Sequence, residues 1–286
     1  GVAKYLSFLD SSLSISQNID NLFFNISAPL FDEYDAIFKS LFYDKHTFHR
    51  QIVDVLCSKQ SGFTITELGV IIDKEQSDPT NKKLRNAIAE LVDTGFITPL
   101  NKLHNKTRET KYIISDHFCL FHYKWVRELS KNDIVSMKNH FTNILSSQSY
   151  TIWCGFVFEI VMMINIDLYV QKRGLSALYK NVTYWQYIAN PNIEDDKGAQ
   201  IDMVIEYENN IYDIVECKYY NDEFTITKEY ADNLRHKVSK FKEYGIKQKM
   251  RYDLKLVMLT TYGSKKNSHF NALNIASDIT LGDLID

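Results

Sequence analysis

The sequence predicts a mixed chain, α+β or α/β, with two domains. Its 286 residues suit two domains of ordinary size. In the first half, apolar residues recur mostly at helical spacing. In the second half, apolar and polar residues alternate with the period of a strand, and helical patterns lie on both sides of this stretch. We therefore expect a largely helical first part and a second part with the element order α-β-β-β-α-β.

Composition and charge exclude several classes of protein. Apolar residues make up 45% and charged residues 24% of the chain, which is typical of a globular protein. The formal net charge of −3 does not by itself indicate nucleic acid, so any basic surface must be local. The four cysteines lie far apart and form no C-x-x-C pair, which argues against a zinc site or a disulfide framework. No apolar run has the length of a membrane span and no signal peptide is evident, so we expect a cytoplasmic protein with reduced thiols and no membrane partner.

Residues 1–45 are expected to form a helical segment. A short helix is predicted to begin after Ser16, as its N-cap, and to end at Phe24. A second run carries aromatic and aliphatic residues at helical spacing between positions 31 and 42. We interpret this stripe as packing against a neighbouring element.

Residues 46–130 are predicted to be a winged-helix domain with a connecting helix. The residues from Thr64 to Glu67 form a capping-box pattern, and Gly95 suits the position after a helix C-terminus. His46 and His49 are three apart, but no third ligand is near, so we interpret them as surface histidines. The expected elements are helices over 47–59, from 64 onward and over 79–94, strands over 96–98 and 110–114, a polar wing over 101–108, and the connecting helix over 116–129.

The winged-helix region carries a local excess of positive charge. Between positions 79 and 111 there are seven basic and three acidic residues, a net charge of +4. A basic recognition helix and a basic wing could contact DNA phosphates. A protein-binding winged helix with a solvated charged face fits the same pattern, because winged helices serve both roles. The candidate DNA contacts are Lys82, Lys83, Arg85, Lys106 and Arg108.

The second domain, over 131–286, is organised around a predicted β-hairpin. Two strand patterns flank Asn209 and Asn210, which tolerate the positive φ of a tight turn. The hairpin strands are placed at 201–207 and 211–219, the other strands at 182–188, 254–261 and within 273–285, and the helices at 132–145, 150–169 and 227–244.

Two carboxylates and a lysine are expected to converge on this hairpin. Period-2 alternation puts Glu216 and Lys218 on one side of the second strand, and pairing about the turn puts Asp202 beside Glu216. Such a set suits a divalent metal and a phosphate oxyanion, although a solvated hairpin with an exposed Glu/Lys pair fits the same residues. Glu159 is a carboxylate in a nearly apolar helix, so it must lie at an exposed edge, be paired, or bind a metal. We assign it to the same site.

A basic helix follows the hairpin. Between 235 and 251 there are seven basic residues and one acidic residue, a net charge of +6. Tyr230 is expected in the buried stripe of this helix, and Lys237 and Lys240 could reach a phosphate beside the carboxylates. A solvated, lysine-rich helix face explains any single one of these lysines equally well.

The spacing from Asp202 to Glu216-Cys217-Lys218 resembles the PD-(D/E)xK nuclease superfamily. In that superfamily a helix before the hairpin often contributes another acid, which would be Glu159 here. The order α-β-β-β-α-β is also similar to its common core, so the resemblance implies a restriction-endonuclease-like fold for 131–286. Ile201 stands where the superfamily often has proline, and Cys217 stands where it usually has an aliphatic residue.

A second resemblance is carried by short stretches spread over nearly the whole chain. They are APLFDEY at 28–34, SLF at 40–42, GFI at 95–97, SDHF at 115–118, KWV at 124–126, WCGFVFE at 153–159, and residues 198–218. These stretches resemble the C-terminal region of archaeal-type AAA ATPases, which ends in a DUF234-type domain. The resemblance implies an ATPase module upstream of Gly1, where the chain lacks an initiator Met. ATP would enter only through that module in cis, because the chain contains no G-x-x-x-x-G-K-[ST] loop.

The nuclease resemblance implies a DNA endonuclease module, a hydrolase that depends on Mg²⁺ or Mn²⁺. Asp202, Glu216, the backbone carbonyl of Cys217 and Glu159 would hold the metal, and oxygen ligands favour these metals over zinc. Lys218 would stabilise charge on the scissile phosphate or position the attacking water.

Two other functions remain open at this point. The chain could be a catalytically silent module that binds DNA or protein and regulates the ATPase, since folds are often retained without their chemistry. Its aromatic surfaces also fit a scaffold that forms a homo-oligomer. Metal binding with cleavage, as opposed to DNA binding without cleavage, would discriminate between the first two functions.

Overall fold

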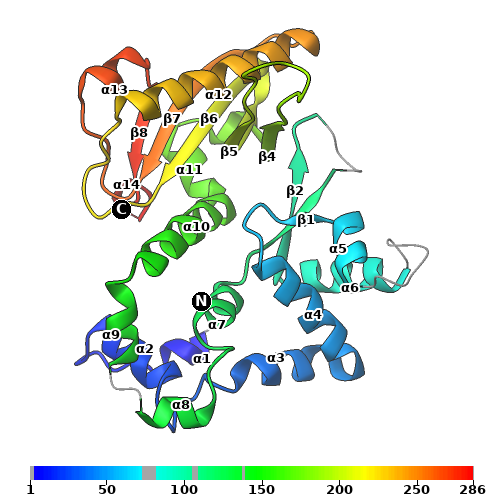
Figure 1. Ribbon diagram of the computed structural model, residues 1–286, viewed down its shortest axis with the longest axis vertical. Helices are drawn as coiled ribbons and strands as arrows, with labels where there is room; N and C mark the ends of the chain where they lie inside the picture. The colour runs from blue at the N-terminus through cyan, green and yellow to red at the C-terminus, as the bar shows by residue number, and fades with distance from the viewer. Residues whose placement is uncertain (1–2, 73–81, 105–108, 137–138, 286) are drawn as a thin grey trace. The chain divides into compact units, whose positions relative to one another are not determined.

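The computed structural model describes residues 3–72, 82–104, 109–136 and 139–285 (Figure 1). The described chain is mixed α/β and contains a mixed sheet. It divides into two compact units. Unit 1 comprises residues 1–99 and 112–154, and unit 2 comprises residues 100–111 and 155–286.

Unit 1 is built from short helices and a few short strand segments. The capping box predicted before the second helix of the winged-helix region is confirmed. The backbone N–H of Thr64 donates to Oε2 of Glu67 at 2.7 Å, and the N–H of Glu67 donates to Oγ1 of Thr64 at 3.3 Å. The elements are α1 (Ala3–Leu6), α2 (Ile15–Phe23), α3 (Glu33–Phe42), η1 (Tyr43–Lys45), α4 (His46–Cys57), β1 (Phe63–Thr64), α5 (Ile65–Ile72), α6 (Lys82–Asp93), β2 (Ile97–Lys102), β3 (Lys111–Ile114), α7 (His117–Trp125), α8 (Lys131–Ser136) and α9 (His140–Leu145).

Two local predictions about helices in unit 1 are wrong. Helix α2 is capped by Ser14 rather than Ser16, because Ser14 and the Gln17 side chain form the reciprocal capping box. The single helix expected over 132–145 is two helices, α8 and α9, and Asn139 before α9 has a left-handed backbone with φ of 51°. A left-handed residue cannot continue an α-helix, so the chain changes direction there.

Unit 2 is a mixed sheet with helices on both faces. The strands follow the order β4-β5-β6-β7-β8, in which β4–β5 and β5–β6 are antiparallel and β6–β7 and β7–β8 are parallel. The end of β2 also pairs with β4, in parallel. The elements are α10 (Gln148–Ile164, which begins in unit 1), α11 (Ile166–Lys172), η2 (Ser176–Leu178), β4 (Tyr179–Tyr187), β5 (Ala199–Tyr207), η3 (Glu208–Asn210), β6 (Ile211–Lys218), α12 (Lys228–Lys247), β7 (Asp253–Thr260), α13 (Ser268–Ala272), β8 (Ser277–Thr280) and α14 (Gly282–Ile285).

Strand alternation decides which helix each side chain of the sheet meets. On one face, α10 and α11 pack against Val215 and Cys217 of β6. On the other face, α12 packs Phe241 against Ile214, and Figure 1 shows α12 lying along the sheet. Glu216, whose parity matches that of Ile214, therefore faces α12.

The hairpin between β5 and β6 has the predicted turn. Asn209 and Asn210 have φ values of 59° and 60°, which the short polar side chain of asparagine tolerates. A bulge also interrupts β5, because Ile201 pairs with Trp185 and Val204 pairs with Thr183, which leaves one extra residue on β5. Bulges re-aim side chains, and Asp202 lies within this one.

The long helix predicted over 150–169 is two helices, α10 and α11, because the chain bends at Asn165. The Asn165 side chain donates a 2.8 Å hydrogen bond to the carbonyl of Val161 and competes with the helical ladder. In the part of the chain that the structure describes, no single helix is long and apolar enough to cross a membrane. Within the same described residues, α10 and α11 reach that length and composition when taken together, but they are bent by 73°.

Candidate functional site

Asp202, Glu216 and Lys218 lie together on the α12 face of unit 2. The Nζ atom of Lys218 lies 3.2 Å from Oε1 of Glu216. The β5–β6 register ends with Met203 opposite Val215, and Asp202 and Glu216 are the next residues along the two strands. Oδ2 of Asp202 accepts a 2.9 Å hydrogen bond from the backbone N–H of Cys217. The structure thus brings together the three side chains that the strand pattern predicts to converge.

Glu216 is enclosed, with 2% of its surface exposed. Its Oε1 accepts a 2.6 Å hydrogen bond from the Tyr230 hydroxyl, and its Oε2 accepts a 2.7 Å hydrogen bond from Nζ of Lys237. Burial raises the pKa of Glu216, but the charges of Lys237 and Lys218 outweigh burial and hold this pKa below its ordinary value. Glu216 is therefore an ionised carboxylate with both oxygens already engaged.

The pKa of Asp202 is shifted in the opposite direction to that of Glu216. Burial and the neighbouring negative charge of Glu216 raise the pKa of Asp202 to about 6, against the opposing effect of Lys237 and Lys218. Two adjacent carboxylates whose pKa values are driven apart are typical of functional sites, because each suits a different charge state.

Glu159 lies on α10, which covers the opposite face of the sheet, and it influences this group through its charge. It does not join Asp202 and Glu216 in a group of three metal-holding side chains among the described residues. Burial lowers the pKa of Lys218, but Glu216, Asp202 and Glu159 outweigh burial and raise it. The charge of Glu159 also contributes to the raised pKa of Cys217, for which burial is the main cause. The Cys217 thiol is thus kept protonated and is a poor metal ligand.

Two residues of α12 complete the group in a way that the sequence did not indicate. Tyr230, expected only as a buried stripe residue, donates to Glu216, and Lys237, expected at a DNA phosphate, is bound to Glu216 instead. The two are seven residues apart, which is about two helical turns, so they share one face of α12. This seven-residue spacing, on the helix that follows the Glu-x-Lys strand, is the sequence signal that could have indicated their shared contact with Glu216.

Lys240 does not join the carboxylates. Its Nζ lies 2.7 Å from Oδ1 of Asp196 and 3.7 Å from Oε2 of Glu243, and 4.4 Å from the centre of the Tyr187 ring. Asp196 also accepts hydrogen bonds from the Tyr187 hydroxyl and from the backbone N–H of Asn190. Lys240 therefore ties the loop after β4 to α12.

The donors at this site suit Mg²⁺ or Mn²⁺, which need few protein ligands, rather than a metal that is coordinated entirely by protein side chains. Among the residues that the structure describes, no three His, Cys, Asp or Glu side chains form a group that could hold a metal ion. Mg²⁺ is commonly held by one or two carboxylates, with water and substrate phosphates as further ligands. Asp202 and Glu216 supply two such carboxylates. Burial, and after it the negative charge of Glu216, raise the pKa of Asp202, and a nearby cation would oppose both effects.

The predicted DNA contacts of unit 1 lie partly outside the described residues. Lys82, Lys83 and Arg85 are exposed on the first turn of α6. The Nζ atom of Lys83 lies 4.2 Å from the centre of the Phe48 ring. Lys106 and Arg108 belong to the segment that the structure does not describe.

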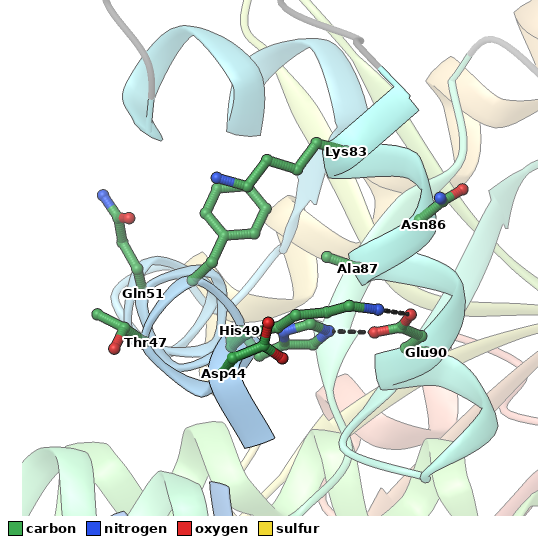
Figure 2. A pocket seen from close by; sticks show the side chains of 10 residues that line it. Asp44, Thr47, His49, Gln51, Lys83, Asn86, Ala87 and Glu90 are labelled. Atoms are coloured by element: carbon green, nitrogen blue, oxygen red, sulfur yellow. Dashed lines mark hydrogen bonds and ion pairs between the residues drawn. The ribbon is translucent and has the colours of Figure 1, made fainter. Parts of the chain in front are cut away.

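A pocket of about 530 Å³ lies between α4 and α6 in unit 1 (Figure 2). His49 lines it and is 1% exposed, so the expectation of a surface histidine is wrong. Its Nε2 lies 2.7 Å from Oε2 of Glu90 and its Nδ1 lies 3.0 Å from the carbonyl of Lys45. The ring also stacks on Phe42 with centroids 4.0 Å apart. These contacts explain the burial of His49 as packing between α4 and α6.

Comparisons with protein-family models, curated proteins and solved structures return no match to this chain.

Proposed function

We propose that unit 2 is a metal-dependent nuclease module of the PD-(D/E)xK type that hydrolyses phosphodiester bonds in DNA. The observation that carries the proposal is the convergence of Asp202, Glu216 and Lys218 on one face of the sheet. The succession of α10 with α11, then β4, β5, β6, α12 and β7 supports it, because this order matches the α-β-β-β-α-β core of that superfamily.

Each residue has a role in this proposal. Asp202 and Glu216, with the Cys217 carbonyl, would hold Mg²⁺ or Mn²⁺. Glu159, which the sequence assigned to the same site, would act on it through its charge rather than as a third carboxylate ligand. The metal would lower the pKa of a bound water and neutralise negative charge that develops on the phosphate. Lys218 stays protonated and donates to a phosphate oxygen, so that the charge that develops in the transition state meets a fixed cation. Tyr230 and Lys237 fix the orientation of the Glu216 carboxylate.

Unit 1 would contribute contacts to DNA in a winged-helix arrangement. The exposed basic side chains of α6 support this role, because phosphate contacts dominate non-specific affinity for DNA. Simultaneous replacement of Lys82, Lys83 and Arg85 by Ala is expected to weaken duplex binding and to reduce its salt dependence. Unchanged binding would show that this face of α6 does not contact DNA. If the resemblance to AAA ATPases holds, an ATP-binding module would act on this chain in cis.

The test is a cleavage assay on single-stranded, branched and plasmid DNA with Mg²⁺ or Mn²⁺. Asp202→Asn should abolish cleavage, and Lys218→Met should slow it by about a hundredfold to a thousandfold without loss of DNA binding. Lys255→Met is the matched control, because Lys255 lies on the neighbouring strand β7, opposite Asp213 and far along β6 from Lys218. Cleavage that persists in Asp202→Asn would contradict the proposal.

A second function has an observation in its favour. Both oxygens of Glu216 are engaged by Tyr230 and Lys237, so a metal must share or displace these partners. A catalytically silent module that binds DNA or protein and regulates the ATPase would keep such a neutralised carboxylate. DNA binding by the wild-type chain with no cleavage of any substrate, in either metal, would support this function.

A further inference from the structure

Two exposed tyrosines leave the sheet beside the candidate site. Tyr220 and Tyr262 follow the ends of β6 and β7 and are 51% and 62% exposed. The two strands are parallel and Lys218 is paired with Thr260, so both tyrosines emerge at the edge of the sheet where Lys218 lies. Large aromatic rings that are half in solvent at the rim of a site are more informative than scattered exposed apolar residues.

The backbone that presents these rings is held firmly. Oγ1 of Thr261 accepts a 2.7 Å hydrogen bond from the N–H of Tyr220 and donates a 2.7 Å hydrogen bond to its carbonyl. The two following loops are joined as well. The N–H of Phe224 donates to the carbonyl of Gly263 at 2.8 Å, and the N–H of Lys265 donates to the carbonyl of Phe224 at 2.9 Å. The backbone that carries the rings therefore needs little ordering when a ligand binds.

A row of aromatic rings connects Tyr220 to the carboxylates. The Tyr220 and Phe224 rings have centroids 6.1 Å apart at 80°, and the Phe224 and Tyr230 rings have centroids 5.1 Å apart at 76°. Tyr230 in turn donates to Glu216. A group that stacks on Tyr220 would thus lie at the end of a row of rings that reaches the candidate site.

Cations accompany these rings. Lys218 ends β6 two residues before Tyr220, and Lys265 is exposed in the loop that carries Tyr262. An aromatic face beside a cation matches a nucleobase beside its phosphate, and stacking on aromatic side chains is how proteins hold single strands without reading their sequence. The bases of a continuous duplex are stacked on each other, so they cannot offer their faces to a tyrosine.

We propose that Tyr220 and Tyr262 form a stacking platform for unpaired bases, so that unit 2 takes single-stranded DNA or a single-stranded branch rather than continuous duplex. The inference rests on the proposed nuclease function, which supplies the reason to expect a nucleic acid here. It adds the class of substrate, single-stranded DNA, and the two residues that would select it, Tyr220 and Tyr262.

The test is the affinity of the full chain for fluorescein-labelled oligo-dT and for a blunt duplex of equal length, by fluorescence anisotropy in EDTA. Tyr220→Ala and Tyr262→Ala should each weaken oligo-dT binding by between about fivefold and a hundredfold, the range that corresponds to the loss of one base stack. Duplex binding should not change. Tyr220→Phe and Tyr262→Phe keep the ring and should restore oligo-dT binding. Tyr43→Ala, at a tyrosine of unit 1 that is 76% exposed, is the control and should have no effect.

The platform is refuted if the double alanine variant binds oligo-dT as the wild type does, if duplex affinity falls equally, or if the wild type does not bind oligo-dT. The absence of metal separates this test from catalysis. Cleavage together with unchanged oligo-dT affinity in the double variant would retain the nuclease and reject the platform. Tyrosine-dependent binding of oligo-dT without any cleavage would retain the platform and reject the nuclease.

Discussion

The Nζ atom of Lys237 lies 2.7 Å from Oε2 of Glu216, and both side chains are largely withdrawn from solvent, with 15% and 3% exposed. The pair joins the middle of α12 to the end of β6. Because a buried carboxylate is costly without a partner, this contact fixes where α12 lies on the sheet as well as how the Glu216 carboxylate is oriented. The same lysine thus contributes to the stability of unit 2 and to the geometry of the candidate site.

Replacing Lys237 should therefore destabilise the chain. In Lys237→Met, Glu216 keeps Tyr230 and Lys218 but loses its strongest cation, so the free energy of unfolding should fall by about 2–3 kcal/mol. Urea denaturation measures this change. Lys242→Met removes an exposed lysine from the same helix and should change the free energy by less than about 0.5 kcal/mol. Equal effects of the two variants would show that the ion pair contributes nothing.

Asp213 is the most enclosed of the described acids of unit 2, with no exposed surface. Nε and Nη2 of Arg173 donate to its two oxygens at 2.8 and 3.0 Å, and the hydroxyls of Tyr169 and Tyr207 donate to Oδ2 at 2.8 and 3.0 Å. Asp213→Asn leaves Arg173 without a counter-charge, so the free energy of unfolding should fall by about 3–5 kcal/mol.

The matched control for Asp213→Asn is Asp253→Asn. Asp253 lies on the adjacent strand β7, is exposed and contacts only Lys255 among the ion pairs of the described residues. Its replacement should cost less than about 1 kcal/mol, because surface ion pairs contribute little. The account of Asp213 would be wrong if both variants unfolded at the same urea concentration.

The local features of unit 2 could be predicted from the sequence because they depend on neighbours along the chain. Alternation assigns Glu216 to one face and Val215 to the other, and two adjacent asparagines mark the turn of the hairpin. Pairing about that turn then brings Asp202 to Glu216. Each step uses geometry that is fixed within about twenty residues.

The partners of Lys237 and His49 could not be predicted in this way. Whether Lys237 meets a phosphate, solvent or Glu216 depends on how α12 packs on the sheet, and its own pattern allows all three. His49 is buried because Glu90, 41 residues away, reaches its Nε2. A contact of this kind is set by tertiary packing, which overrides the surface preference of an isolated histidine.

Gly62 should tolerate no side chain. Its φ is 67°, and a Cβ added there would lie 2.3 Å from the backbone carbonyl oxygen of Tyr112. Gly95 has a similar φ of 78° but open space around the added Cβ. Gly95→Ala should therefore cost about 1–2 kcal/mol for the left-handed backbone alone. Gly62→Ala should lose in addition about 1–3 kcal/mol for the steric overlap. Urea denaturation of the two variants compares them, and equal losses would show that the carbonyl of Tyr112 moves freely.

His122 gives unit 1 a dependence on pH. Burial lowers the pKa of His122 to about 4 from an ordinary value of 6.5, and its ring stacks on Tyr34 with centroids 4.2 Å apart. The unfolded chain therefore binds this proton at a higher pH than the folded chain does. The stability contributed by the neutral ring is complete above about pH 6.5 and is lost as the pH falls toward 4, a loss of about 3 kcal/mol.

His122→Phe should remove this dependence, because phenylalanine keeps a ring against Tyr34 and cannot be protonated. The Nδ1 atom of His122 is buried without a hydrogen-bond partner, so its removal leaves no new polar atom unsatisfied. The free energy of unfolding, measured in urea at a series of pH values, should fall less steeply in the variant between pH 6.5 and 4. His104→Phe, at an exposed histidine, should keep the wild-type slope. If His122→Phe also keeps that slope, the acid sensitivity of the chain has another origin, such as the carboxylates of unit 2.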